Sequence, residues 1–266
     1  MTTKLVEVKP AKYVSFADGF KQTLAMAQRA LIRMWRTPEQ SLDVLLMPII
    51  FTVMFTYIFG GAISGNVKSY LPIIIPGIIV QTVISASIVT GVNLREDMDK
   101  GVFDRFRAMP IARIAPLAGA LMADLLRYIV ATSITLITGY FMGFRPKSFG
   151  GVLLAIALVT FTAWCVSWIF AFAGLKARSA AAVNGISMMI MFPLTFLSNA
   201  FVDPKTMPSW LQKFVEANPL SHLITAVREL LNQGHIGQQV VYTLVGALII
   251  VAIFMPLCLR EYMKKS

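Results

Sequence analysis

The sequence contains few of the residues from which most catalytic and metal sites are built. Only two of its 266 residues are cysteines, and only two are histidines. Cys165 and Cys258 lie in separate apolar runs without a cluster of further ligands, which favours free thiols in a hydrophobic core over a disulfide or a metal site. His222 and His235 have no carboxylate or cysteine at a ligand spacing. No metal ligand is therefore expected.

A phosphate-binding loop of the form Gly-x-x-x-x-Gly-Lys-Ser/Thr is also absent from the sequence, so the chain has no ordinary means of binding ATP. A membrane-embedded hydrolase or lipid transferase is expected to gather several acidic or histidine side chains near one interface. Asp124 is the only acid deep within an apolar run. The sequence accordingly predicts a protein that is not an enzyme, with no catalytic residue and no cofactor site of its own.

Charged residues are scarce as well, at 14%, while 57% of the residues are hydrophobic and the mean hydropathy is +0.71. Soluble domains average about 45–50% apolar residues. The excess is gathered into runs of roughly 20 residues, the length of a membrane-spanning helix. We therefore expect an all-α integral membrane protein with six spans. The predicted spans cover residues 41–61, 70–94, 116–143, 151–174, 180–200 and 240–259.

The distribution of the net charge of +11 predicts the topology of the chain. Seven lysines and arginines lie in the first 40 residues, five in residues 95–115, two at Lys176 and Arg178, and three after Leu259, all on one side if the spans alternate. The opposite loops contain six. Such an excess marks the cytoplasmic side, so we expect both termini there, in a multi-pass protein of a bacterial cytoplasmic membrane. The basicity indicates topology and contact with anionic lipid, not a nucleic-acid partner.

Residues 1–40 form a polar leader, and we expect no cleaved signal peptide within it, so that the first apolar run remains as an anchor. Residues 16–36 predict an amphipathic helix, with Arg29, Arg33 and Arg36 on one face. Its apolar side chains recur at steps of three and four: Phe16, Phe20, Leu24, Ala27, Leu31 and Trp35. This pattern is typical of a helix in the membrane interface, with arginines toward headgroups and water. A soluble helix packed on a partner is the alternative.

The most charged stretch lies between the second and third predicted spans, in residues 93–110. A loop so rich in charge cannot lie in hydrocarbon. From about Lys100 to Met109 it has helical order, and Pro110 ends the helix. One face carries Val102, Phe103, Phe106 and Met109, and the other carries Asp104, Arg105 and Arg107. A short amphipathic helix in such a loop needs a cover for its apolar face, so we interpret it as a docking surface for another protein.

Two charged residues are predicted within the third span. Asp124 and Arg127 are three positions apart, hence on one helix face and able to pair. Charges at membrane depth usually face protein or water and are often functional. A buried pair that fixes helix packing and a part in transport both remain open.

The fifth predicted span is rich in methionine and phenylalanine, which form an adaptable apolar surface. Its candidates for a substrate path are Met188, Met191, Phe192 and Phe196, although such residues at helical spacing more often reflect ordinary packing. The following segment, residues 201–239, predicts two amphipathic helices too short to span the bilayer. The second begins after Asn218, which reads as an N-cap, with Pro219 at the first helical position.

Three stretches together resemble the permease subunits of ABC type-2 exporters, and within them the daunorubicin-resistance permease branch. Glu96–Ile111 is similar to the family signature acidic-x-x-x-Gly-x-apolar-x-Arg-apolar-x-x-Met/Leu-Pro. Gly139–Arg145 resembles the family's mark at the end of the third span. Phe201–Trp210 and Asn218–Arg228 resemble its outer segment before the last span. The resemblance covers most of the chain from Ser41 onward.

The resemblance implies a half-exporter whose residues 41–266 form the permease domain. Two permease chains, identical or related, would bind two copies of a separate ATPase subunit that carries ATP and Mg. A hydrophobic drug, antibiotic or lipid would cross the cytoplasmic membrane. The charged loop would be the coupling helix, with an apolar ridge for affinity and charged flanks for register. The docking residues are then Glu96, Asp97, Lys100, Gly101, Val102, Phe103, Asp104, Arg105, Phe106, Met109 and Pro110.

Two other functions remain open at the level of the residues. An ion-coupled secondary carrier would need ionisable or broken-helix sites at mid-membrane, and one aspartate beside an arginine supports that poorly. A non-transporting membrane anchor would recruit a cytosolic protein through the same charged loop.

Overall fold

The computed structural model describes residues 16–265 of the chain, except for residues 108, 110, 113 and 203. Regular structure in this part is entirely helical. In chain order the helices are α1 (Phe16–Arg36), α2 (Pro38–Ser64), α3 (Val67–Asp99), α4 (Val102–Arg107), α5 (Ala115–Met142), α6 (Phe149–Lys176), α7 (Ala180–Phe196), the 3-10 turn η1 (Pro204–Thr206), α8 (Ser209–Ala217), α9 (Pro219–Asn232) and α10 (Gln238–Lys265). The predicted all-α class is confirmed.

Five of these helices are long and apolar enough to cross a membrane: α2 from Val44 onward, α3, α5, α6 and α10. They correspond to the first four predicted spans and to the last one. The fifth predicted span, residues 180–200, is shorter in the structure, because α7 ends at Phe196. At 17 residues, α7 is about 26 Å long, slightly less than the roughly 30 Å hydrocarbon core of a bilayer. The chain is thus a multi-pass membrane protein with five candidate spans.

Helix α3 forms the centre of the bundle. In its most apolar stretch 72% of the residues are buried, against 11% for α10, which lies at the periphery. Small residues allow neighbouring helices to approach it closely. A Cβ at Gly91 of α3 would lie 2.1 Å from the Phe170 carbonyl oxygen of α6, and a Cβ at Gly174 would lie 2.3 Å from the Gly91 carbonyl oxygen. The α3–α6 contact therefore requires glycine at both positions, as in other close helix pairs in membranes.

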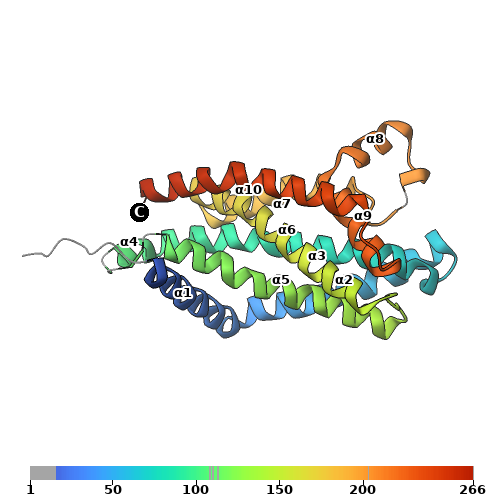
Figure 1. Ribbon diagram of the computed structural model, residues 1–266, viewed down its shortest axis with the longest axis horizontal. Helices are drawn as coiled ribbons and strands as arrows, with labels where there is room; N and C mark the ends of the chain where they lie inside the picture. Colours follow the sequence, from blue (N-terminus) through green and yellow to red (C-terminus); the bar gives the residue numbers. More distant parts are fainter. Residues whose placement is uncertain (1–15, 108, 110, 113, 203, 266) are drawn as a thin grey trace, which may run out of the picture.

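The bundle is elongated, and its two ends differ in character (Figure 1). Helix α4, part of α1 and the C-terminal end of α10 lie at one end, which we call the α4 end. Helices α8 and α9 lie at the other, which we call the α9 end. The sequence predicts that the leader, the charged loop and the C-terminus lie on one side of the membrane. In the structure, part of α1, helix α4 and the end of α10 lie together at the α4 end.

Two prolines interrupt the hydrogen bonding of α3 near the α9 end, and α9 repairs the gap. Pro76 has no N–H, so the carbonyl of Pro72 loses its normal partner within the helix. The Nδ2 of Asn232 donates to that carbonyl at 2.9 Å. At the next residue, the Nη2 of Arg228 donates to the Ile73 carbonyl at 3.2 Å. Helix α9 is therefore fixed to α3 through two adjacent carbonyls, one of which Pro76 leaves without its helical donor.

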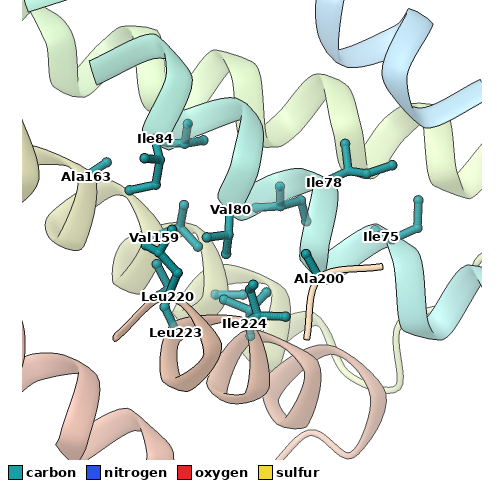
Figure 2. Close-up of a cluster of buried hydrophobic side chains, with 14 of the residues drawn as sticks. Ile75, Ile78, Val80, Ile84, Val159, Ala163, Ala200, Leu220, Leu223 and Ile224 are labelled. Carbon is teal, nitrogen blue, oxygen red and sulfur yellow. The ribbon is translucent and has the colours of Figure 1, made fainter. Parts of the chain in front are cut away.

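Apolar packing continues this attachment of α9. Figure 2 shows Ile78, Val80 and Ile84 of α3 facing Val159 of α6 and Leu223 of α9 across one continuous cluster. The predicted N-cap at Asn218 is confirmed, since its Oδ1 accepts from the Leu220 N–H at 2.9 Å. The same side chain donates through Nδ2 to the carbonyls at the end of α7. The α9 end is thus one packed unit.

The two cysteines are free and buried, as the sequence predicts. Cys165 lies on α6 and Cys258 on α10.

Candidate functional site

The charged stretch between α3 and α5 adopts a helix that is shorter than predicted. Lys100 is the C-cap of α3, and its N–H donates to the Glu96 carbonyl at 2.9 Å. Gly101 follows with φ of 65°, a left-handed conformation that favours glycine. Helix α4 begins only at Val102 and ends at Arg107, instead of running from Lys100 to Met109. A sharp glycine turn, not a continuous helix, therefore joins α3 to α4.

The apolar face of α4 does not form the exposed ridge that the periodicity predicts. Phe103 is only 8% exposed, and its ring lies 5.2 Å from that of Tyr262 on α10. It belongs to a cluster that α3, α5, α6 and α10 supply at the α4 end. The chain's own C-terminal helix thus covers Phe103, and its role in docking a partner stays a prediction.

Other side chains of the coupling segment, which we define as residues 93–109, point outward. Met109 is 41% exposed, and Arg105 and Lys100 are exposed. Val102 is partly buried. Pro110 and the side chain of Asp104 lie outside the described residues. The described exposed side chains of the coupling segment are therefore mostly charged, with Met109 as an exposed apolar contact.

Helix α1 contacts the coupling segment through its arginines, which the sequence analysis expects to face headgroups and water. Arg33 forms ion pairs with Asp97 and, at 3.4 Å, with Glu96 at the end of α3. The Arg29 guanidinium lies 4.9 Å from the centre of the Phe106 ring on α4. Arg36 is exposed, and the side chain of Trp35 lies outside the described residues. The arginine face thus serves largely to hold the coupling segment.

The fit of α1 on α5 depends on Gly119. A Cβ there would lie 2.5 Å from the Met26 Cβ and 2.9 Å from the Ala27 nitrogen of α1. The Gln22 side chain also accepts from the Ala112 N–H at 2.7 Å, in the loop that leads from α4 to α5. Phe20 and Leu24, on another face of α1, remain exposed, as expected for a helix at a membrane interface.

Asp124 and Arg127 form the predicted ion pair inside the bundle. The Arg127 Nη1 and the Asp124 Oδ1 are 2.9 Å apart, and both side chains are almost fully buried. The Thr90 hydroxyl of α3 donates to the Asp124 Oδ2 at 2.6 Å. The carboxylate is therefore held from two helices, which is the arrangement that a buried charge requires. Sequence reasoning identified the pair but not Thr90.

A cavity of about 630 Å³ lies between α2, α3, α5 and α7. The four residues predicted for a substrate path all line it: Met188, Met191, Phe192 and Phe196. Phe51 and Phe55 of α2 face them across the cavity, and Gln81 of α3 and Arg127 of α5 contribute polar groups. The volume lies within the roughly 300–1,000 Å³ typical of sites for drug-sized ligands. The α7 side chains thus form one wall of a real cavity.

Stacked phenylalanines connect α2 and α7 toward the α9 end of this cavity. Phe192 and Phe196 have ring centres 4.7 Å apart, Phe196 and Phe201 5.4 Å, and Phe201 and Phe55 4.9 Å. The Tyr70 hydroxyl at the start of α3 donates to the Phe201 carbonyl at 2.8 Å, which fixes this row at the α9 end. We call these four phenylalanines the aromatic row. Phe55 and Phe201 are not among the residues that the sequence pattern predicts for this site.

Arg127 lies between the cavity and the coupling segment. It lines the cavity described above and also a smaller one of about 70 Å³, whose walls include Arg29, Arg33 and Phe103. The predicted ion pair therefore separates the helices that hold the coupling segment from the space beside α7.

Comparison with known proteins gives consistent results along the chain. The family model of the ABC-2 type transporter matches residues 21–232. The daunorubicin resistance ABC transporter permease protein of Streptomyces coeruleorubidus is 43% identical over 251 residues, which cover 94% of this chain and 89% of that protein. A protein of Mycobacterium tuberculosis, named as a probable doxorubicin resistance ABC transporter permease, is 24% identical over 234 residues, 85% of this chain and 84% of that protein.

Proposed function

Because the chain belongs to the ABC-2 type transporter family and is the membrane permease subunit of an ABC exporter, we propose that it moves a hydrophobic, drug-sized compound across the membrane through the cavity between α2, α3, α5 and α7. The observation that carries this proposal is that cavity, whose wall joins α2 to α7 by apolar and aromatic side chains. The compound would leave the cytoplasm or the inner leaflet.

Helix α7 serves as a sixth membrane crossing in this proposal. Its beginning lies near the α4 end, since the Ala177 carbonyl just before it accepts from Arg95. The Leu197 carbonyl just after it accepts from Asn218 at the α9 end. A helix that joins the two ends of the bundle crosses it once. Six crossings bring both termini to one side, which the charge distribution assigns to the cytoplasm.

ATP and Mg are bound by a separate ATPase subunit, present in two copies, which meets the α4 end. Lys100, Arg105 and Met109 supply the exposed contacts, while Phe103 anchors α4 to its own bundle. The ion pairs of Arg33 then transmit the motion of the coupling segment to α1, and Gly119 carries it to α5. Two permease chains, identical or related, complete the exporter in a bacterial cytoplasmic membrane.

Export requires the cavity to change the end at which it opens. In the present arrangement the aromatic row joins α2 to α7 on the α9 side. Movement of α2 and α7 relative to the fixed α3–α9 unit would part this row and release the compound outward. Such rocking of packed helices between two states is a common form of conformational switching.

The test is ATP-driven transport by the reconstituted complex. We expect inverted vesicles that contain this chain and its ATPase to accumulate daunorubicin on addition of ATP and Mg. A proton ionophore should leave the uptake unchanged, and a variant ATPase that cannot hydrolyse ATP should abolish it. Uptake that needs a proton gradient but no ATP would contradict the proposal and favour an ion-coupled carrier. Partner binding without any ATP-driven transport would favour a membrane anchor.

A further inference from the structure

A buried polar side chain in the cavity wall, that of Gln81, has an oxygen atom without a hydrogen-bond partner among the described residues. Gln81 of α3 lines the cavity and is only 8% exposed, and its Oε1 accepts no hydrogen bond within the described part of the chain. By contrast, the nearby Ser85 hydroxyl already donates to the Met191 sulfur at 3.2 Å. Buried amides are almost always hydrogen-bonded, because burying one without a partner is costly. The Gln81 carboxamide is therefore available to a bound molecule.

Arg127 supplies a second polar group to the same wall. Its guanidinium has five N–H donors in a planar fork, and the ion pair with Asp124 engages one side of it. The residue is 6% exposed and lines the cavity. Because Asp124 already balances its charge, Arg127 can donate to an uncharged acceptor, such as a carbonyl or hydroxyl oxygen, without requiring an anion.

The helix geometry gives the axial offset between the backbones of these two residues. Thr90 of α3 bonds Asp124 of α5, and the two helices run in opposite directions. Arg127 is three residues beyond Asp124 toward the α9 end, and Gln81 is nine residues beyond Thr90 in the same direction. The difference of six residues corresponds to about 9 Å along the helix axes.

We infer that the cavity selects an apolar, drug-sized compound that carries two hydrogen-bonding groups, one held by the Gln81 amide and an acceptor held by Arg127. The apolar body lies between Phe51 and Phe55 of α2 and the α7 wall. This inference rests on the proposed function and specifies its substrate class.

The test compares two probes on the co-purified complex of the chain and its ATPase in detergent. Daunorubicin carries hydroxyl and carbonyl groups on a flat ring system and an amine on its attached sugar, and its binding is followed by fluorescence anisotropy. Anthracene, a flat ring system without polar groups, serves as the competitor. We expect Gln81→Leu to weaken daunorubicin binding roughly 2- to 10-fold, the usual effect of losing one neutral hydrogen bond. Competition by anthracene should remain within twofold of the wild-type value.

The second variant removes both charges of the ion pair at once, so that neither is left buried alone. Asp124→Asn with Arg127→Gln is expected to weaken daunorubicin binding roughly 10- to 100-fold, because a hydrogen bond to a charged donor is lost. If this double variant fails to reach the membrane, Gln81→Leu alone decides the question.

Equal loss of both probes in Gln81→Leu would overturn the inference, because it would indicate a general change in cavity shape. Unchanged daunorubicin binding in the same variant would overturn it too, as would saturable binding of a fluorescent phosphatidylethanolamine without any binding of daunorubicin. ATP-driven transport that persists in these cases would leave the proposed function intact. Absence of ATP-driven transport for every probe would instead count against the proposed function itself.

Discussion

The burial of Phe103 makes a prediction that separates two roles for the coupling segment. Its ring lies against Tyr262 of α10, inside the cluster at the α4 end, and Cys258 lies in the same cluster one turn before Tyr262. Replacing a buried phenylalanine by alanine costs about 3–5 kcal/mol. Since α4 has only six residues and lies at the end of the bundle, we expect the lower value, about 3 kcal/mol, for the local packing of α4.

The thiol of Cys258 provides the assay. It is fully buried, and the other cysteine of the chain, Cys165, can be replaced by alanine. In that background, N-ethylmaleimide labels Cys258 only when the cluster opens locally. A loss of about 3 kcal/mol in the free energy of local opening corresponds to a rate of labelling roughly 100-fold faster in Phe103→Ala. Met109→Ala should leave the rate unchanged but weaken co-purification of the ATPase, because Met109 is exposed.

One result would refute this reasoning. If Phe103→Ala labels at the wild-type rate and yet abolishes binding of the ATPase, then Phe103 contacts the partner and not α10. The apolar ridge expected from the sequence alone would in that case be correct.

Three further predictions follow from contacts at the two ends of the bundle. Arg33→Glu should reduce cargo-stimulated ATPase activity several-fold, because it places an acid beside Asp97. The double variant Arg33→Glu with Asp97→Arg should restore most of this activity. Failure of the double variant to restore it would indicate that the ion pair is not the coupling contact. Gly119→Leu should displace α1 and abolish transport while the complex still reaches the membrane, and a fully active variant would contradict the observed close approach of α1 and α5. Asn232→Ala should leave the Pro72 carbonyl without its donor and lower the free energy of unfolding by about 1–3 kcal/mol. The melting temperature should fall by about 5 °C. An unchanged melting temperature would mean that water replaces the amide.

The helices were predictable because hydrophobic runs of a fixed length are a local property. Predicted span ends differ from those of α5 and α6 by only one or two residues at each terminus. Helices α3 and α10 continue five and six residues beyond their predicted ends, while α7 ends at Phe196, four residues before the predicted end at Ala200. There Asn218, distant in sequence, takes the terminal carbonyls of the helix. Periodicity contains no information on such a contact.

The candidate site was only half predictable for the same reason. The helical period correctly places Phe103 and Phe106 on one face, but the sequence does not say which surface covers that face. In the structure, the Phe103 ring packs against Tyr262 of α10 and the Phe106 ring against the Arg29 guanidinium of α1. Phe51, Phe55 and Phe59 recur every four residues, and this spacing was enough to predict a second aromatic wall on α2 from the sequence. Gln81 offered no such signal, because its isolation becomes visible only when the neighbouring helices are in position.

The repair of α3 by α9 has a consequence for how the chain is made. The carbonyls of Pro72 and Ile73 receive donors from Asn232 and Arg228, about 160 residues later in the chain. An unpaired carbonyl in hydrocarbon costs several kcal/mol. Until α9 has been synthesised, the proline-containing turns of α3 must therefore stay hydrated near the membrane surface. Helix α3 thus reaches its final depth in the membrane only as the ribosome finishes the last quarter of the protein. Insertion of the first membrane crossings and completion of the protein core are therefore separate events in time.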